Sequence, residues 1–223
     1  MLLLLLLIVV PAPAYAQQEQ PPLVRVGTEG TYPPFSFHDP QTQELTGYDV
    51  EVVKAIGAKA GWRLEFVETQ WDAIFPALDA ERIDVIANQV SVNDERQARY
   101  GLSETYTFSH GVIVRRKGDN SIRTLADLKG KTTAQSATSN WAQVARDAGA
   151  NVEAVEGFAQ AAALLAQGRV DAIVNDNIAV LDYLASTGSD DVEIAVSVPL
   201  ARSSSSAPLS SGSRPLFLRA AKP

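Results

Sequence analysis

The chain has 223 residues, of which 46% are hydrophobic and 20% are charged, as in ordinary globular proteins. Its formal net charge is -7 and its Lys and Arg residues are scattered, which excludes a basic surface for nucleic acid. It has no cysteine and only two histidines, so disulfides, thiolate or histidine-rich metal sites and a cysteine-linked lipid anchor are excluded. We therefore expect neither a metal nor a cofactor.

The chain begins with a predicted signal peptide. Residues 2–10 form an apolar run too short to span a bilayer, and two prolines and the tripeptide Ala14-Tyr15-Ala16 follow. This pattern predicts cleavage after Ala16 and a periplasmic protein without a lipid anchor. A membrane anchor is the alternative, and the missing positive charge at the start suggests a misplaced start codon or lost first residues.

Strand and helix patterns alternate through the first half of the mature chain. A strand at residues 23–27 leads into an irregular loop that contains Tyr32 and two prolines. An amphipathic helix, a second strand, a second helix and a third strand are predicted at 47–60, 64–68, 71–80 and 84–87. This order predicts a parallel, doubly wound sheet flanked by helices.

Polar residues gather directly after the third strand. Asn88, Gln89 and Ser91 lie where the carboxyl end of a parallel strand opens onto a crevice. Asn93 or Asp94 can then N-cap a short helix that carries Glu95 and Arg96. Free backbone N–H groups, amides, a hydroxyl and a guanidinium within a few residues suit a small carboxylate. The alternative is an ordinary capped helix with a surface arginine.

The alternation begins again after an extended stretch at residues 107–115. Further helices and strands are predicted at 124–128, 131–134, 139–147, 152–155, 158–167 and 170–174. Residues 82–89 (RIDVIANQ) and 169–176 (RVDAIVND) share a pattern in which polar groups follow a buried strand. Two such strand ends facing each other would form a cleft between lobes. Independent convergence on the same strand pattern is the alternative.

From Pro199 the sequence changes to Ser, Pro, Ala and Arg without a period, which predicts a tail without fixed structure. The expected divisions are a signal peptide, a first lobe, a second lobe and the Ser-rich tail, at residues 1–16, 22–110, 111–198 and 199–223.

Four motifs carry a resemblance to a known family: EGTYPPFSF, LTGYDVE, RIDVIANQVSVNDER and ETYTFSHG. With them, residues 23–196 resemble the bacterial extracellular solute-binding proteins, family 3, of polar amino-acid ABC transporters, and most of all the cystine- or cysteine-binding members. The resemblance implies an α/β, two-lobe periplasmic-binding-protein fold of type II, a Venus flytrap with a mostly parallel sheet in each lobe. It also implies a monomer that closes over one free polar amino acid and docks on the ABC permease in the inner membrane.

The resemblance assigns the two charged ends of the ligand to opposite lobes. Arg96 would grip the α-carboxylate, helped by Ser91 in the first lobe. Thr138 and Ser139, at a helix start in the second lobe, would help as well, and Asp176 would take the α-ammonium. A fixed cation, a fixed anion and helix-terminal N–H groups are what a zwitterion requires. Thr138 as a simple helix cap is the alternative.

The resemblance also assigns the wall around the ligand side chain. Tyr32 and Trp71 would cover its aliphatic or disulfide-bearing part, and polar contacts would come from Glu29, Asn88 and Gln89. The two aromatic residues could instead be part of the core.

Two departures from the family pattern matter. Ala137 stands where glycine is frequent, so a less close approach to the backbone is expected there. The usual return to the first lobe, with a long final helix, is absent, and the Ser-rich ending resembles a frameshifted or truncated gene. Apolar surface on the first lobe would then be uncovered.

An enzyme on the same fold and a sensor lobe are the two rival functions. Cyclohexadienyl or arogenate dehydratases share this fold, but no placed catalytic acid is evident beyond Glu29, and His38 and His110 lie outside the cleft motifs. No catalytic residue is therefore assigned, and a non-enzymatic binding protein is expected. A sensor lobe would be expected to continue into a transmembrane segment. No other apolar run in the sequence is long enough to cross a membrane.

Overall fold

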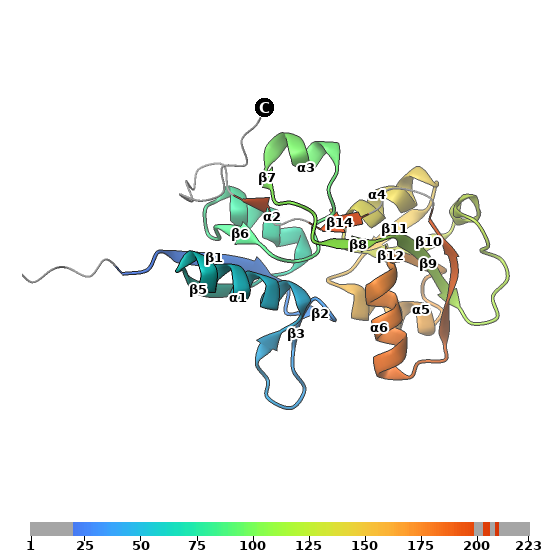
Figure 1. Cartoon of the computed structure of the whole chain (residues 1–223). Coiled ribbons are helices and arrows are strands. Elements are labelled where there is room, and N and C mark those ends of the chain that lie inside the picture. The colour runs from blue at the N-terminus through green and yellow to red at the C-terminus, as the bar shows by residue number, and fades with distance from the viewer. Residues whose placement is uncertain (1–19, 199–202, 206–207, 210–223) are drawn as a thin grey trace, which may run out of the picture.

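The computed structural model describes residues 20–198, 203–205 and 208–209, which form two α/β lobes side by side (Figure 1). The predicted signal peptide and much of the predicted tail lie outside these residues. Within the described part of the chain, no helix has the length and apolar character needed to cross a membrane.

The first lobe is built on a five-stranded sheet with the order β5-β1-β6-β15-β7. Its neighbours β5, β1 and β6 are parallel, as the alternating pattern predicted, while β15 is antiparallel to both β6 and β7. The elements are β1 (Leu23–Thr28), α1 (Tyr48–Ala60), β5 (Arg63–Glu68), α2 (Trp71–Asp79), β6 (Val85–Ile86), α3 (Asp94–Arg99), β7 (Gly101–Leu102) and β15 (Pro208–Leu209).

The two long helices of this lobe cover opposite faces of its sheet. Val85 of β6 belongs to the core cluster of Val53 on α1, and its neighbour Ile86 belongs to the cluster of Ile74 on α2. Consecutive strand residues point to opposite faces, so one helix must lie on each face.

A small antiparallel sheet lies beside the first lobe, in a region where the sequence predicted only irregular loops. It is formed by β2 (Thr31–Tyr32), β3 (Ser36–His38) and β4 (Leu45–Thr46). Strands of two or three residues are too short to show the alternation by which strands are recognised. The loop between β2 and β3 is joined to the start of α1, where Tyr48 N and Asp49 N donate to the carbonyl oxygens of Pro34 and Phe35.

The second lobe also has a five-stranded sheet, with the order β11-β10-β12-β9-β13. Strands β11, β10 and β12 are parallel, whereas β9 and β13 run antiparallel beside them. The elements are β9 (Gly111–Arg116), the 3-10 helix η1 (Leu125–Leu128), β10 (Thr132–Gln135), α4 (Asn140–Asp147), β11 (Asn151–Ala154), α5 (Phe158–Ala166), β12 (Ala172–Asp176), α6 (Asn177–Thr187) and β13 (Val192–Ser197).

Helices again cover both faces of the sheet. Val112 and Val114 of β9 share a core cluster with residues of α5 and α6, while Ile113 between them packs in the cluster of Trp141 on α4. Neither α6 nor β13 was predicted from the sequence pattern, which indicated no element after residue 174. Helix α6 begins at a side-chain cap, where Asp176 Oδ1 accepts a hydrogen bond from Ile178 N.

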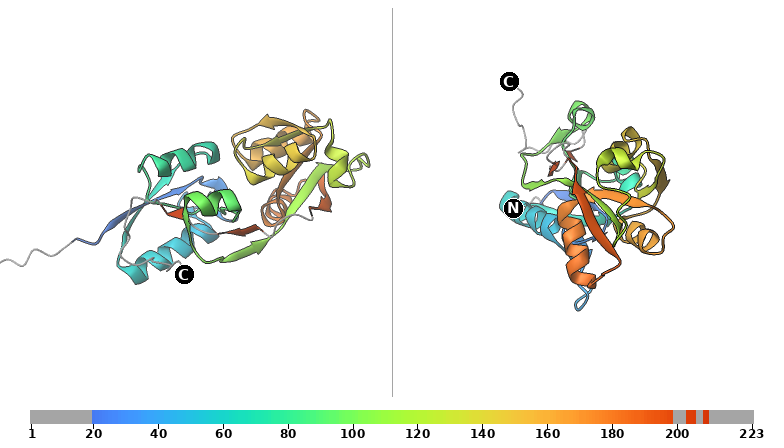
Figure 2. Two further views of the ribbon diagram at one scale, coloured as in Figure 1. Left: turned by 90° about the horizontal axis from the view of Figure 1, so that it is seen from above. Right: turned by 90° about the vertical axis from the view of Figure 1, so that its right-hand side faces the viewer.

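Two extended segments run between the lobes (Figures 1 and 2). These are β8 (Thr107–Ser109) and β14 (Ser203–Ser205), which pair antiparallel. Strand β15 then enters the first-lobe sheet, where Leu209 lies opposite Val85 of β6 and Gly101 of β7.

Strands β14 and β15 differ from the expectation of a structureless tail at residues 199–223. The physical reason is that strand pairing uses main-chain groups, so a run of serines can pair with β8 without an apolar pattern. In β15, Leu209 likewise pairs through its backbone with Val85 of β6 and Gly101 of β7. The chain thus crosses back to the first lobe in these two short strands, while no long final helix is found among the described residues. The remaining tail residues lie outside the described part.

The backbone conformation of Gly47, the residue directly before α1, can be tested by substitution. Its φ is 119°, and a Cβ atom there would lie 2.3 Å from the carbonyl oxygen of Phe35. We expect Gly47→Ala to lower the free energy of unfolding by about 3 kcal/mol or more in urea denaturation, since strain and clash add. Gly118→Ala is the control, because Gly118 also has a positive φ, 79°, but no described atom lies within 4 Å of the added carbon. It should cost only about 1 kcal/mol. Equal losses would contradict this account.

Candidate functional site

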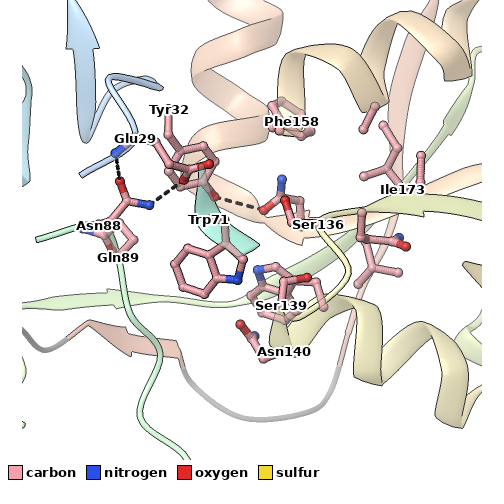
Figure 3. A pocket seen from close by; sticks show the side chains of 17 residues that line it. Glu29, Tyr32, Trp71, Asn88, Gln89, Ser136, Ser139, Asn140, Phe158 and Ile173 are labelled. Atoms are coloured by element: carbon pink, nitrogen blue, oxygen red, sulfur yellow. Dashed lines mark hydrogen bonds between the residues drawn. The ribbon is translucent and has the colours of Figure 1, made fainter. Parts of the chain in front are cut away.

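A cavity, here called the first cavity, lies between the two lobes (Figure 3). Its walls come from the carboxyl ends of β1 and β6 and from α2 in the first lobe, and from β10, α4, α5 and β12 in the second. The lining residues are Glu29, Tyr32, Trp71, Asn88, Gln89, Ala134, Gln135, Ser136, Ser139, Asn140, Trp141, Gly157, Phe158, Ala161, Ile173, Val174 and Asn175.

A second cavity shares Ser139 and Asn140 with the first. Arg96 and Thr138 line this second cavity. Of the ten residues predicted for the site, the first cavity therefore gathers Glu29, Tyr32, Trp71, Asn88, Gln89 and Ser139, and the second gathers Arg96, Thr138 and Ser139. The remaining two, Ser91 and Asp176, line neither of these cavities.

Glu29 is the acidic group of the first cavity, and Asn88 holds it in place. The Asn88 side chain accepts a hydrogen bond from Glu29 N at 2.8 Å and donates one to Glu29 Oε2 at 2.5 Å (Figure 3). Burial raises the pKa of the Glu29 carboxyl from 4.5 to about 7, although hydrogen bonds from Asn88 and from the Trp71 backbone act to lower it. The carboxyl group can therefore be either donor or acceptor near neutral pH.

Gln89 reaches the cavity from a strained backbone position. Its φ is 47°, and its backbone N and its Nε2 donate to the two carboxylate oxygens of Asp49, each at 2.7 Å. Tyr106 OH donates to the same carboxylate at 3.0 Å. Burial raises the pKa of Asp49 to about 6. Asp49, in the first turn of α1, thus fixes the turn after β6.

Arg96 is a buried cation, contrary to the alternative of a surface arginine. Its side chain is 7% exposed, and its guanidinium lies over the rings of Trp71 and Phe75, at 5.3 and 5.2 Å from the ring centroids. Its Nη1 donates to the carbonyl oxygen of Ser91 at 2.9 Å. Among the described residues, no carboxylate lies within ion-pair distance of it. Burial lowers its pKa to about 10.

Two polar contacts join the lobes across the cleft. Tyr32 OH donates to Asn175 Oδ1 at 3.0 Å. On the other side of the cleft, the Asp72 carboxylate accepts hydrogen bonds from Ala137 N at 3.0 Å, Thr138 N at 2.9 Å and Thr138 Oγ1 at 2.7 Å. A carboxylate thus approaches the backbone closely at Ala137 although this residue has a Cβ atom.

The second-lobe residues predicted for the site have structural roles as well. Ser139, rather than Thr138, caps α4, since its Oγ accepts a hydrogen bond from Ala142 N at 3.0 Å. The buried carboxylate of Asp176 caps α6 and also accepts a hydrogen bond from Ser109 Oγ.

Sequence reasoning missed Asp72, Gln135 and Asn175. Asn175 directly precedes Asp176 in the RVDAIVND segment, which had been compared with the segment ending in Asn88 and Gln89. That comparison was the signal that could have found it. Gln135 ends β10, the strand next to β12, and the same reasoning about strand ends applies to it.

Asp72 gives a testable prediction about the contact between the lobes. Asp72→Asn removes the charge from three hydrogen bonds and can accept through only one oxygen, so we expect the separated arrangement of the lobes to become about 5 to 30 times more populated. Small-angle scattering would report this as a larger radius of gyration. Asp79→Asn on the same helix is the control, because Asp79 bonds to Arg99 and Tyr100 within the first lobe. An unchanged radius for Asp72→Asn would contradict the prediction.

Glu29 gives a prediction about pH. Its carboxyl is harder to ionise in the folded protein, so its stabilising contribution is complete below pH 4.5 and is lost as the pH rises through about 7. Glu29→Gln should therefore flatten the fall in unfolding free energy between these pH values, and the raised pKa of Asp49 should leave a residual slope. Urea denaturation across this range checks the prediction, with Glu44→Gln in an exposed loop as the control. Equal slopes in Glu29→Gln and the parent would refute it.

Comparison with known proteins agrees with this architecture. The family model of the bacterial extracellular solute-binding proteins, family 3, matches residues 24–141. The L-cystine-binding protein TcyA of Bacillus subtilis is 51% identical over 173 residues, which are 78% of this chain and 64% of that protein. The chain thus spans slightly less than two thirds of that relative.

Solved structures have the same arrangement. An ancestral arginine-binding protein bound to arginine has a TM-score of 0.79 at 35% identity, with 87% of each chain covered. The L-cystine solute receptor of Neisseria gonorrhoeae, in the unliganded open conformation, has a TM-score of 0.54 at 46% identity, with 85% of this chain and 80% of that one covered. The chain belongs to the bacterial extracellular solute-binding proteins, family 3, and has a two-lobe fold of periplasmic amino-acid-binding proteins.

Proposed function

We propose that this protein is the substrate-binding component of an ABC importer and captures a free polar L-amino acid between its lobes. The observation that carries the proposal is Arg96, a buried guanidinium without an acidic partner among the described residues, on a cavity between two lobes. A buried charge is costly unless an opposite charge compensates it. An amino-acid carboxylate at this position would supply that charge.

The two cavities together have the form that such a ligand requires. The second cavity, with Arg96, would take the α-carboxylate end, and the first cavity, which meets it at Ser139 and Asn140, would take the side chain. Trp71 lies between them, since it lines the first cavity and its ring faces the Arg96 guanidinium. Cystine or cysteine is the favoured ligand, because the chain is similar to proteins whose names state that they bind L-cystine.

The further parts of the proposal follow from that function. The closed protein would deliver its amino acid to permease subunits in the inner membrane, as a periplasmic monomer exported by its signal peptide. Asp176 remains the proposed partner of the α-ammonium, although its carboxylate also caps α6 and accepts from Ser109. Thr138 and Ser91 would assist at the carboxylate end.

A dehydratase on the same fold is the rival proposal, and one observation favours it. The pKa of Glu29 near 7 is suitable for a general acid in a cavity. A thermal-shift screen of free amino acids, run together with turnover assays on prephenate and arogenate, distinguishes the two. A shift without turnover supports transport, and turnover of either compound would overturn the non-enzymatic function.

Arg96 and Asp176 test the clamp on the two ends of the ligand. We expect Arg96→Ala and Asp176→Ala each to weaken binding by about 2 to 5 kcal/mol, roughly thirty-fold to several thousand-fold, because each leaves a buried charge unpaired. Arg96→Lys should restore little, since an ammonium cannot reproduce the planar fork of a guanidinium. Isothermal titration with the best ligand of the screen measures this, and thermal melts establish that each variant is folded. If both alanine variants bind within a factor of about three of the parent, the clamp is wrong.

A further inference from the structure

Asp49 is a buried carboxylate that no cation neutralises. It lies in the first turn of α1, is fully buried, and takes part in no ion pair among the described residues. Burying a carboxylate is costly, so hydrogen bonds must compensate it. Its oxygens accept three, from Gln89 N and Gln89 Nε2 at 2.7 Å each and from Tyr106 OH at 3.0 Å. Asp49 thus joins two segments that lie 40 and 57 residues further along the chain.

The first of these segments is the turn after β6, which lines the first cavity through Asn88 and Gln89. Gln89 has a φ of 47°, a left-handed conformation that is unfavourable for a residue with a Cβ atom. Asp49 holds this residue by its backbone N–H and by its side-chain amide, which stabilises the conformation. Two residues further on, the carbonyl oxygen of Ser91 accepts a hydrogen bond from Arg96. The position of this whole turn therefore depends on Asp49.

The second segment is the connection between the lobes. Tyr106 directly precedes β8, one of the two strands that run from lobe to lobe (Figures 1 and 2). At the other end of β8, Ser109 Oγ donates to the buried carboxylate of Asp176, which caps α6 in the second lobe. A buried carboxylate thus fixes each end of β8, Asp49 in the first lobe and Asp176 in the second. A rotation of one lobe against the other acts on the backbone between these two points.

We infer that Asp49 is a positioning residue that couples the first cavity to the connection between the lobes. Asp49 itself lines neither cavity, and it acts through Gln89 on the cavity side and through Tyr106 on the connecting side. The carboxylate that holds the turn against a bound amino acid is then the one that fixes the start of β8 in the closed form. This inference rests on the proposed function and specifies how closure is transmitted. A role confined to the stability of the first lobe is the alternative.

Tyr106→Phe tests the coupling from outside the cavities, because Tyr106 lines neither of them. We expect this variant to bind L-cystine about three- to ten-fold more weakly, mainly through faster dissociation, since a closed form that is held less firmly releases its amino acid sooner. Stopped-flow tryptophan fluorescence measures both rates, because Trp71 and Trp141 line the first cavity. If the parent does not bind L-cystine, the standard amino acid that it binds most tightly is the probe.

Tyr48→Phe is the matched control for Tyr106→Phe. The Tyr48 hydroxyl donates to the carbonyl oxygen of Tyr106 at 3.2 Å, so this variant also removes one tyrosine hydrogen bond to the connecting segment. It leaves the bond between Tyr106 OH and Asp49 in place, so both rates should change by less than about two-fold.

Asp49→Asn completes the test. It keeps one acceptor oxygen in place of two and loses the charge, so it cannot serve the three donors as they are arranged. We expect binding to weaken at least about ten-fold, and the addition of Tyr106→Phe to weaken it by no more than about two-fold further, because the hydroxyl acts through Asp49. Glu51→Gln is the control, since Glu51 lies in the same helical turn but is exposed and bonds to Lys54. Small-angle scattering with saturating amino acid should show a larger radius of gyration for Asp49→Asn and Tyr106→Phe than for the parent.

The outcomes separate this inference from the proposed function. Faster dissociation and incomplete closure in Tyr106→Phe, both absent from Tyr48→Phe, support the inference, and this comparison decides alone if thermal melts show that Asp49→Asn does not fold. Binding that Tyr106→Phe leaves within about two-fold of the parent, or losses that multiply when the two variants are combined, overturn the inference and leave the proposed function standing. Failure of the parent to bind L-cystine or any standard amino acid overturns both.

Discussion

A buried arginine without an acidic partner is the constraint that gives the cleft its form. Removing a guanidinium from water is costly, and the faces of Trp71 and Phe75 and the carbonyl oxygen of Ser91 compensate only part of that cost. The first turn of α3 and the start of α2 must therefore stay close together, which fixes one wall of the cleft. Anion binding is the simplest way in which such a site lowers its free energy.

The hydrophobic core clusters lie within the lobes and not between them. Each of the four core clusters draws its residues from one lobe alone, so hydrophobic packing stabilises each lobe separately. Across the cleft, Tyr32 and Asp72 of the first lobe make hydrogen bonds to the second lobe. Contacts of this kind cost little to break compared with a core, so a ligand with a few strong interactions can shift the balance between open and closed forms.

The sequence was sufficient for the parts of the structure that depend on local patterns. The alternation of strands and helices predicted the two α/β lobes, and polar residues after buried strands located Asn88 and Gln89 at the cavity. Helix α6 and strand β13 were missed, and so were β14 and β15, where pairing depends on partners far away along the chain. The same holds for Asp72, whose contacts with Ala137 and Thr138 span more than sixty residues of sequence. Such contacts leave no local periodicity.

In a binding protein of this fold, the groups that bind the part common to all amino acids cannot be the groups that determine specificity. A cation that binds the α-carboxylate, the role proposed for Arg96, contacts a group that every free amino acid carries, so it cannot distinguish one amino acid from another. Under the proposed function, discrimination must come from polar groups that line the first cavity, such as Glu29 with its raised pKa. An unpaired buried donor discriminates more strongly than an apolar wall, because a ligand that lacks the acceptor leaves the donor's desolvation uncompensated. Under the proposed function, polar groups of the first cavity can therefore provide selectivity beside an arginine that accepts the carboxylate of any amino acid.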